Sequence, residues 1–310
     1  MSKIIQPMLA TLTDKPFDDK AWVFETKWDG FRVIASIAKG KVTLYSRNGE
    51  IVSDRYIDIV KALEKIKHDA VIDGELVALD NKGRSRFQLL QNALRKKTNL
   101  YYYVFDIMSL DGKSMCDLTL LERKEALKKI IPDDTVIRFS EHRTTNGSRY
   151  FTEAKKAGEE GIMAKRADST YQSGKRSRDW LKIKTGLRQE FVIVGFTEPR
   201  LSRKYFGSLA LAVHDGKVWH YVGHVGTGFD AEDLKSIHAK LSKIKAEKSP
   251  FTEKVKFEST TTWVKPEVVC EVKFTEWTLG GELRHPAFLG LREDKKATEV
   301  IMEIVKPKIS

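Results

Sequence analysis

One lysine near the start of the chain stands in a setting that could do covalent chemistry. It is Lys27, within the stretch FETKWDGFR, where Asp29, Gly30 and Arg32 follow at K-x-D-G-x-R spacing. A lysine amine is nucleophilic when it is unprotonated, and apolar burial or neighbouring cations lower its pKa. Glycine lets the backbone approach a ligand closely, and a guanidinium can bind phosphate through two hydrogen bonds. The pattern predicts a lysine nucleophile beside a phosphate, although a surface hairpin with alternating charges would read the same.

Five further blocks of the chain carry candidate ligands for a nucleotide and a metal. They are SRNGE with Arg47, DGEL with Glu75, VFDIMSLDG with Phe105, EEGIMAKR with Glu160, and DWLKIKTG with Lys182 and Lys184. Cations neutralise phosphate, a phenyl ring can stack on a base, and carboxylates suit Mg²⁺. Strand residues two apart share a face, so the two lysines would point to one side, where an anion would offset their repulsion. The plainer alternatives are a turn for Glu75, a core position for Phe105 and a solvated strand face for the lysines.

The elements that must position these residues mix strands and helices in the first part of the chain. FRVIASIAKGKVTLYSRNG predicts a hairpin that turns at Gly40, and AVIDGELVALDNKGR predicts a strand that runs into a turn. YYYVFDIMSLDG predicts a buried strand that ends in an Asp-Gly turn. A helix is expected over Thr119–Ile131, because Thr119 and Glu122 form a capping box and apolar residues recur on one face.

After about residue 187 the pattern changes to short strands separated by turns, among them FVIVGF, GSLALAV, KVWHYVGHVG and EVVCEVKF. One helix, DAEDLKSIHAKLSKI, begins at an Asp230 cap. Several short strands with one helix favour a small β-barrel, and the OB-fold is our first choice. We therefore expect an α+β protein. Its first domain, residues 1–187, has antiparallel sheets and flanking helices, and a β-barrel OB-fold domain follows over residues 188–310.

Composition limits the kinds of partner. The formal net charge is +12, which favours a polyanion such as nucleic acid. The basic span from Lys165 to Arg188 includes QSGKRSRDW, which reads as a loop that contacts a nucleic-acid backbone or as an exposed loop without a partner. No apolar run is long enough to cross a membrane and no signal peptide is visible, so a cytoplasmic protein is expected. Cys116 and Cys270 form no C-x-x-C and read as buried thiols.

Taken in order and with their spacings, the blocks around Lys27, Arg47, Glu75, Phe105, Glu160 and Lys182 resemble the nucleotidyltransferase superfamily of ATP-dependent DNA ligases and mRNA capping enzymes. The C-terminal stretch EWTLGGELRHPAFLGLREDK is similar to the R-x-D-K closing motif of DNA ligases. Its form is that of the ligase module of bacterial-type non-homologous end-joining ligases, namely ligase D and its stand-alone relatives. The resemblance covers nearly the whole chain, and the first domain would be the adenylation domain of that superfamily.

The resemblance implies a role for each candidate. Lys27 would attack the α-phosphate of ATP and form lysyl-AMP, and Glu160 would bind the metal. Glu75 would contact the ribose or help to hold the metal. Glu25 would line the nucleotide site, although it could instead be a charge partner of Lys27. The residues expected at ATP or the adenylate are Glu25, Lys27, Arg32, Arg47, Glu75, Phe105, Lys182, Lys184, Arg292 and Lys295.

The implied activity is DNA ligation with ATP and with Mg²⁺ or Mn²⁺. AMP would pass from Lys27 to the 5′-phosphate of a nick, and the 3′-OH would then displace AMP. Nicked or broken double-stranded DNA is the expected substrate, in non-homologous end joining at the nucleoid. A Ku-type end-binding protein and a repair polymerase are the expected partners of a monomeric chain that binds no membrane. An RNA ligase, a guanylyltransferase and a non-catalytic nucleic-acid-binding OB-fold scaffold are the alternatives. The RHPAFLGLREDK ending argues against capping.

Overall fold

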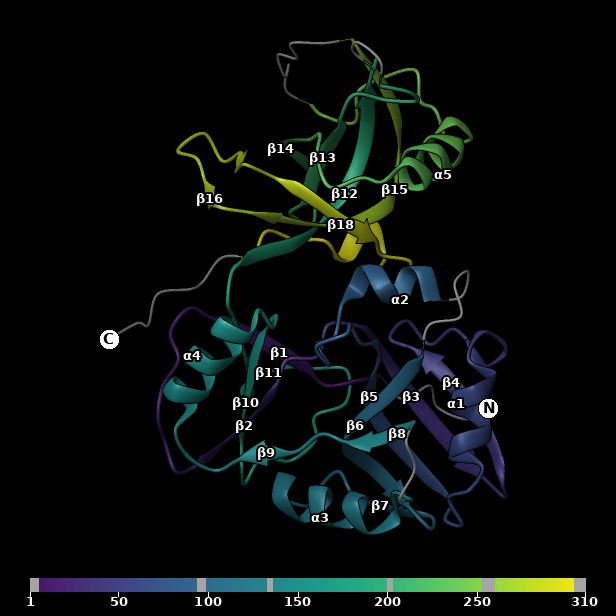
Figure 1. Cartoon of the computed structure of the whole chain (residues 1–310), viewed down its shortest axis with the longest axis vertical. Helices are drawn as coiled ribbons and strands as arrows, with labels where there is room; N and C mark the ends of the chain where they lie inside the picture. Colours follow the sequence, from purple (N-terminus) through teal and green to yellow (C-terminus); the bar gives the residue numbers. More distant parts are fainter. Residues whose placement is uncertain (1–5, 94–98, 133–135, 200–202, 253–259, 304–310) are drawn as a thin grey trace. The chain divides into compact units, whose positions relative to one another are not determined.

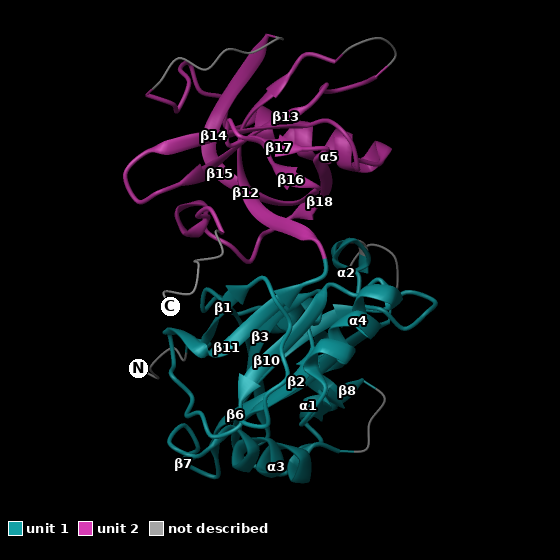
Figure 2. Cartoon of the chain, turned by 90° about the vertical axis from the view of Figure 1, so that its left-hand side faces the viewer, with its two compact units in different colours: residues 1–185, 305–310 teal, residues 186–304 magenta. Residues whose placement is uncertain are grey.

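The computed structural model describes residues 6–93, 99–132, 136–199, 203–252 and 260–303. The chain divides into two compact units, one of residues 1–185 with 305–310 and the other of residues 186–304 (Figure 2). Unit 1 holds two sheets with helices packed around them, and the described residues of unit 2 form a five-stranded sheet, a small hairpin and one α-helix (Figure 1).

The first sheet of unit 1, called sheet 1, contains five strands in the order β1-β11-β10-β2-β9. Its strands are β1 (Leu9–Thr13), β2 (Trp22–Thr26), β9 (His142–Arg143), β10 (Gly161–Arg166) and β11 (Arg176–Lys184). The pairings are antiparallel except for β1 with β11, which is parallel. Strands that are far apart in sequence therefore lie side by side, so that the segment around Lys27 neighbours the one around Glu160.

The second sheet, called sheet 2, follows the order β4-β3-β5-β6-β7, and β8 pairs with β6 in parallel. Its strands are β3 (Phe31–Ala38), β4 (Lys41–Ser46), β5 (Ala70–Ala78), β6 (Leu100–Leu110), β7 (Lys113–Ser114) and β8 (Ile137–Phe139). The expected hairpin is β3–β4, and it turns through Lys39 and Gly40, both with positive φ. The expected strands around Glu75 and Phe105 are β5 and β6, and they pair with each other.

Four α-helices of the described residues pack around the two sheets of unit 1. They are α1 (Ile57–Leu63), α2 (Phe87–Ala93), α3 (Leu120–Ile130) and α4 (Gly147–Ala157), with a short 3-10 helix at Ser53–Arg55. Thr119 caps α3 through the expected capping box with Glu122. α1 and α3 pack on sheet 2, and α4 packs on sheet 1 (Figure 1). An apolar cluster lies between the two sheets of unit 1. It contains Met8, Ile34, Phe105, Met108, Tyr171 and Trp180.

Unit 2 is built on an antiparallel sheet in the order β14-β13-β12-β15-β18. The strands are β12 (Leu187–Thr197), β13 (Leu209–His214), β14 (Trp219–Val225), β15 (Thr261–Phe274) and β18 (Ala287–Leu291), with a small hairpin of β16 (Glu276–Trp277) and β17 (Leu283–Arg284). The helix α5 (Ala231–Ser242) begins at Asp230, as expected, and a 3-10 helix follows at Ala297–Glu299. Within the described ranges, β14 and β18 remain the edges of this sheet, so the expected barrel is not closed by strand pairing.

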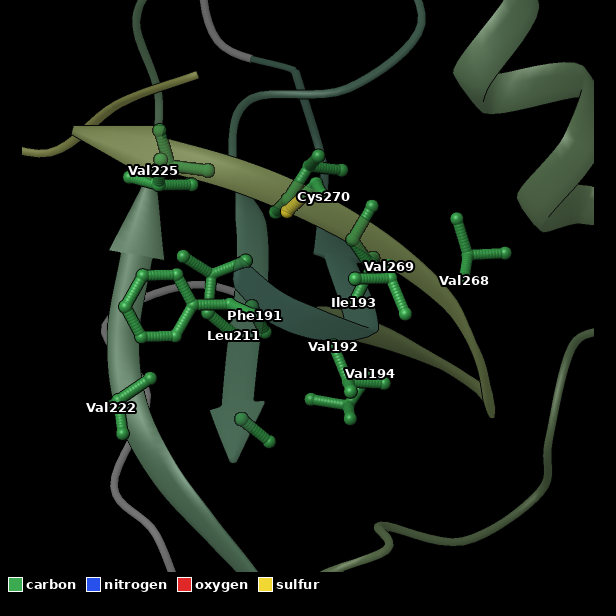
Figure 3. Close-up of a cluster of buried hydrophobic side chains, with 14 of the residues drawn as sticks. Phe191, Val192, Ile193, Val194, Leu211, Val222, Val225, Val268, Val269 and Cys270 are labelled. Carbon is green, nitrogen blue, oxygen red and sulfur yellow. The ribbon is translucent and has the colours of Figure 1, made fainter. Parts of the chain in front are cut away.

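The core of unit 2 is formed by side chains from the middle strands of the sheet. Figure 3 shows Phe191, Val192, Ile193 and Val194 of β12 gathered with side chains of β13, β14 and β15. Cys270 lies within this cluster and is fully buried, whereas Cys116 of unit 1 is half-buried, and both thiols are free. In the part of the chain that is described, none of the helices combines the length and the apolar character needed to span a bilayer.

Candidate active site

The facing sides of the two sheets of unit 1 collect most of the candidate residues. Ile183 packs with α4 on the outer side of sheet 1. Because strand residues alternate, Lys182 and Lys184 lie on the inner side with Trp180. On sheet 2, Val33 packs on the outer side, so Arg32 and Ile34 face inward. The facing sides, together called the inner space here, thus carry an apolar cluster that includes Ile34 and Trp180, and on the same strand faces the charged residues Arg32, Lys182 and Lys184.

Lys27 follows directly after β2, and its amine contacts a carboxylate. Nζ lies 2.6 Å from Oε1 of Glu160, and the two side chains are 18% and 5% exposed. The backbone N–H of Lys27 donates to the carbonyl of Gly161, 3.0 Å away. A Cβ on Gly161 would lie 2.1 Å from the carbonyl oxygen of Ile183, so the position after Glu160 requires glycine. The flanking Phe24 packs in the apolar cluster on the outer side of sheet 1.

The residues that follow Lys27 fix the turn in which it lies. The backbone N–H of Asp29 donates to Oγ of Ser85 at 2.9 Å, and Oδ2 of Asp29 accepts from the N–H of Phe87 at 3.3 Å. A Cβ on Gly30 would lie 2.0 Å from the carbonyl oxygen of Leu76. In the K-x-D-G-x-R motif, aspartate and glycine therefore hold the backbone against β5 and the segment after it. Sequence reasoning missed Ser85, because nothing local links it to the motif.

The aromatic residue between Lys27 and Asp29 is also held. Trp28 stacks on Tyr103 of β6 with ring centroids 3.6 Å apart and an interplanar angle of 21°. Its indole N–H donates to Oγ of Ser140 at 3.0 Å. The turn that carries Lys27 thus has contacts with β6 as well as with β5.

Arg32 is engaged by an acidic neighbour. Its Nε and Nη2 donate to the two carboxylate oxygens of Asp73, which also accepts from the hydroxyl of Tyr171 at 2.7 Å. Burial by itself would lower the pKa of Arg32, but Asp73 raises it, and the net pKa lies above its ordinary value. Nε and Nη2 of Arg32 are thus already used by Asp73. A phosphate that binds Arg32, as predicted, would contact a guanidinium that is also bound to Asp73.

Phe105 is packed between the sheets. Its side chain is buried, with Cζ of Arg32 at 4.7 Å and Nζ of Lys165 at 4.3 Å from the ring centroid. Such distances are those of cation–π contacts. These surroundings are those of a core residue, which was the alternative interpretation of Phe105 from the sequence. Stacking of Phe105 on adenine stays a prediction.

A buried trio of charges lies beside Phe105. Glu25 of β2 accepts from Lys124 of α3 at 2.9 Å and from Lys165 of β10 at 2.8 Å, and each of the three is about 1% exposed. Burial alone would raise the pKa of Glu25, but the two lysines outweigh it and lower the pKa. Burial also lowers the pKa of Lys165, to about 8, despite the attraction of Glu25. The charge partners of Glu25 are thus Lys124 and Lys165, not Lys27.

Sequence reasoning did not select Lys124, although a signal was present. Lys124 is four residues after Leu120 and three before Leu127, and both leucines are fully buried. Side chains at these spacings share one face of a helix. A lysine in the middle of the apolar face of α3 was therefore a marker of a buried partner. Its neighbour Arg123 is also fully buried and binds both carboxylate oxygens of Asp106, at 2.7 and 2.9 Å.

The remaining candidates of unit 1 are Glu75 and Arg47. Glu75 lies in β5 opposite Arg32 on one side and Tyr103 on the other. Arg47 follows β4 in the turn before Gly49. Among the described residues there is no cluster of three or more acidic, histidine or cysteine side chains that could hold a metal by itself. Mg²⁺ often takes one or two carboxylates plus substrate phosphates, and Glu160 beside Lys27 fits that donor set.

In unit 2 the R-x-D-K motif forms a compact ion network after β18. Arg292 binds both oxygens of Asp294 at 2.8 Å and Oε2 of Glu271 at 2.8 Å, while Lys295 contacts Glu190 at 3.0 Å. Burial would lower the pKa of Arg292, but the carboxylates raise it, and the net pKa is well above its ordinary value. The aspartate of the motif therefore serves as a partner of its arginine, which the sequence alone did not indicate.

Two family models match the chain. An ATP dependent DNA ligase domain matches residues 7–184, and an ATP dependent DNA ligase C terminal region matches residues 202–295. The protein named "Multifunctional non-homologous end joining protein LigD" from Pseudomonas aeruginosa is 38% identical over 98% of this chain and 37% of its own length. The LigD protein of Mycolicibacterium smegmatis is 36% identical over 96% of this chain and 39% of its length. The chain thus spans less than half of these curated relatives.

A solved structure, "mycobacterial DNA ligase D complexed with ATP and MES", is 34% identical, covers 96% of this chain and 98% of its own, and superimposes with a TM-score of 0.74. A second, the ligase domain of LigD from M. tuberculosis, gives 0.55 at the same identity. The fold is accordingly α+β, with a ligase adenylation domain followed by an OB-fold domain whose strands do not close into a barrel in the described residues. This chain belongs to the family of ATP-dependent DNA ligases.

Proposed function

We propose that this chain seals nicks or breaks in double-stranded DNA with ATP, through lysyl-AMP and DNA-adenylate intermediates. The observation that carries the proposal is the contact of Lys27 with Glu160, beside the strand that carries Lys182 and Lys184, in a chain of this family. Phosphoryl transfer depends mainly on positioning and on neutralisation of charge. A nucleophilic amine, a carboxylate and two cations on one strand face supply these needs.

The proposed reaction has three steps. Nζ of Lys27 attacks the α-phosphorus of ATP, the bond to the β-phosphate breaks, and pyrophosphate leaves as the amine loses its proton. The 5′-phosphate of the nick then attacks the lysyl-AMP and takes the adenylate from Lys27. Finally the 3′-OH attacks the activated 5′-phosphate, the phosphodiester forms, and AMP leaves. Because Glu160 contacts the amine, their ion pair must open before the first step.

The other candidate residues receive roles in this scheme, which rest on the resemblance and on their place in the inner space. We assign adenine stacking to Phe105, phosphate contacts to Arg32 and Arg47, and contacts with ATP and the adenylate to Lys182 and Lys184. Glu25 lines the nucleotide site, and Glu75 contacts the ribose or the metal. We take residues 1–187 as the adenylation domain and 188–310 as the OB-fold domain.

Glu160, with Glu75, is the proposed holder of Mg²⁺ or Mn²⁺. A divalent ion held by them would neutralise the negative charge that develops on the phosphate groups. Arg292 and Lys295 are the proposed ligands of the pyrophosphate group of ATP. Both contact carboxylates of their own unit, so they must exchange Glu271 and Glu190 for phosphate.

The names of the relatives from P. aeruginosa and M. smegmatis describe proteins of non-homologous end joining. We propose the same pathway here, with a monomeric ligase that acts at the nucleoid in the cytoplasm, on ends held by a Ku-type protein and filled by a repair polymerase. The basic excess of the chain supports a DNA partner.

The test is to incubate the protein with α-labelled ATP or GTP and a divalent cation, denature it, and count the retained label. Retention from ATP, its loss in Lys27→Ala, and sealing of a nicked DNA duplex are expected. Retention from GTP alone would indicate a guanylyltransferase, and sealing of RNA but not DNA would indicate an RNA ligase. No retention from either nucleotide would leave a nucleic-acid-binding scaffold and would refute the proposal.

A further inference from the structure

One loop contacts both turns that carry the reacting groups. It is the segment of residues 80–87, here called the brace loop, which joins β5 to α2. Asp80 organises it, because its carboxylate accepts from the backbone N–H of Lys82 and Arg84 and from Nε of Arg84 at 2.7 Å. Nε of Arg86 donates to the same carboxylate at 3.3 Å. Both arginines are thus directed by one aspartate.

The arginines of the brace loop reach the end of α4. Nη1 of Arg84 donates to the carbonyl of Ala157 at 3.2 Å, and Nη1 of Arg86 donates to the carbonyl of Gly158 at 2.8 Å. The last carbonyls of a helix have no partner within the helix and carry a partial negative charge, which suits a guanidinium. Gly158 lies two residues before Glu160, so this contact fixes the turn from which Glu160 projects.

Alternate residues of the same loop reach the turn of Lys27. Oγ of Ser85 accepts from the N–H of Asp29 at 2.9 Å, and the N–H of Phe87 donates to Asp29 at 3.3 Å. Asp29 and Ser85 are both buried. Asp29 lies two residues after Lys27. The loop therefore binds the turn before Glu160 through Arg84 and Arg86, and the turn of Lys27 through Ser85 and Phe87.

We propose that the brace loop sets the distance between Lys27 and Glu160, with Arg84, Ser85 and Arg86 as positioning residues for lysyl-AMP formation. This inference rests on the proposed function of the site. Lys27 and Glu160 belong to turns that are far apart in sequence, and their side chains meet at 2.6 Å. A displacement of about 1 Å in a reacting group can cost on the order of 10²-fold in rate. A loop that is bound to both turns restricts such displacements.

A contact of the two arginines with DNA is the competing explanation for a basic loop in this protein. The geometry favours the internal role, because each guanidinium donates both to Asp80 and to a backbone carbonyl of the α4 end. A guanidinium whose donors are used in this way has fewer left for phosphate. The experiment therefore has to separate adenylation, which uses no DNA, from sealing.

The experiment compares Arg86→Ala and Ser85→Ala with the control Lys82→Ala, which removes one positive charge from an exposed side chain of the same loop. The rate of lysyl-AMP formation is measured in single turnovers across ATP concentrations. We expect Arg86→Ala and Ser85→Ala to lower the maximal rate about 10- to 100-fold, with little change in the half-saturating ATP concentration. Lys82→Ala should resemble the wild type. Arg86→Lys should recover part of the rate, because its amine can still donate to the carbonyl of Gly158.

Hydrogen exchange followed by mass spectrometry gives a readout that is independent of activity. Arg86→Ala should speed exchange over residues 157–161, and Ser85→Ala over residues 27–30, at an unchanged melting temperature. Unchanged adenylation in both variants would overturn the proposal. So would a rate that falls together with the melting temperature and is not recovered in Arg86→Lys, or a defect confined to sealing. If the wild type itself forms no lysyl-AMP, the proposed function fails, while the exchange data still test whether the loop holds both turns.

Discussion

At the scale of single residues, the amine of Lys27 is held by the carboxylate of Glu160. An ion pair of this kind keeps a flexible side chain in one place before its substrate arrives. Under the proposed function, the amine must leave Glu160 before it can attack phosphorus. The pair would therefore order the proposed nucleophile and would have to open before the first step.

Replacing Lys27 by alanine should abolish formation of lysyl-AMP and leave sealing of a pre-adenylated nick measurable. The reason is that the amine is the nucleophile in the first step alone. Both activities are measured on the same preparation, with Lys41→Ala, a change at an exposed residue of β4, as the control. Equal loss of both activities in a folded Lys27→Ala protein would contradict this assignment.

Lys165 gives a prediction about pH. Its pKa is lowered from 10.5 to about 8 by burial, so between pH 8 and 10.5 the unfolded chain binds a proton at this residue that the folded chain does not. The stability contributed at Lys165 should therefore rise with pH over that window. The free energy of unfolding is measured in urea for the wild type and for Lys165→Met at pH 7.5, 9 and 10. Relative to the variant, the wild type should become more stable as the pH rises. A difference that stays constant with pH would refute the shift.

The residues near Lys27 also show what the sequence could predict. The spacing of Lys27, Gly30 and Arg32 predicted a nucleophile beside a phosphate, because the chemistry follows from the residue types and their local spacing. The use of Asp29 could not be found in this way, since its partner Ser85 lies 56 residues away. Likewise the need for glycine at position 161 depends on a carbonyl of β11. Such requirements arise from pairing across the sheets and leave no local pattern.

At the scale of elements, α3 carries cations into the space between the sheets and the helix. Arg123 and Lys124 are buried on the same helix whose solvent side bears Lys128 and Lys129. The capping box of α3 and the Asp230 cap of α5 were predictable, because each depends on residues three apart. The pairing of β2 with β10 was not, because it joins segments more than a hundred residues apart.

Arg123→Met should destabilise unit 1 strongly. It would leave the carboxylate of Asp106 fully buried without its two hydrogen bonds from Arg123. Removing one partner of a buried ion pair costs about 3–5 kcal/mol. The control, Lys129→Ala, breaks the exposed pair with Glu125 and should cost about 0.5 kcal/mol or less. Urea unfolding measures both, and a similar small cost for the two variants would contradict the buried pairing.

At the scale of the whole molecule, the net charge of +12 favours a polyanionic partner and is consistent with the proposed DNA substrate. We predict that nick binding is largely electrostatic. If about six phosphates are contacted, affinity should fall by roughly 10³-fold between 50 and 200 mM salt. Binding to a labelled nicked duplex is measured across that range, and a shallow dependence would indicate few phosphate contacts.

Adenylation serves as the internal control for this prediction, because it uses no DNA and should depend far less on salt than sealing does. If the two activities decline in parallel, salt acts on the ATP site or on the fold. Adding a Ku-type protein should restore sealing at the higher salt concentrations. Unchanged sealing with that protein would remove the support for end joining and leave the ligase assignment intact.

The two cysteines provide a means of following each unit separately. Cys270 lies in the core of unit 2, where burial raises the pKa of its thiol, and Cys116 is half-buried in unit 1, with its pKa raised mainly by burial. A thiol reagent attacks the exposed thiolate, so Cys116 should be labelled by local fluctuations and Cys270 when the core of unit 2 opens. Labelling rates at the two sites, resolved by peptide mass, would compare local fluctuations around Cys116 in unit 1 with opening of the core of unit 2 around Cys270. Equal rates at both sites under native conditions would contradict the buried position of Cys270.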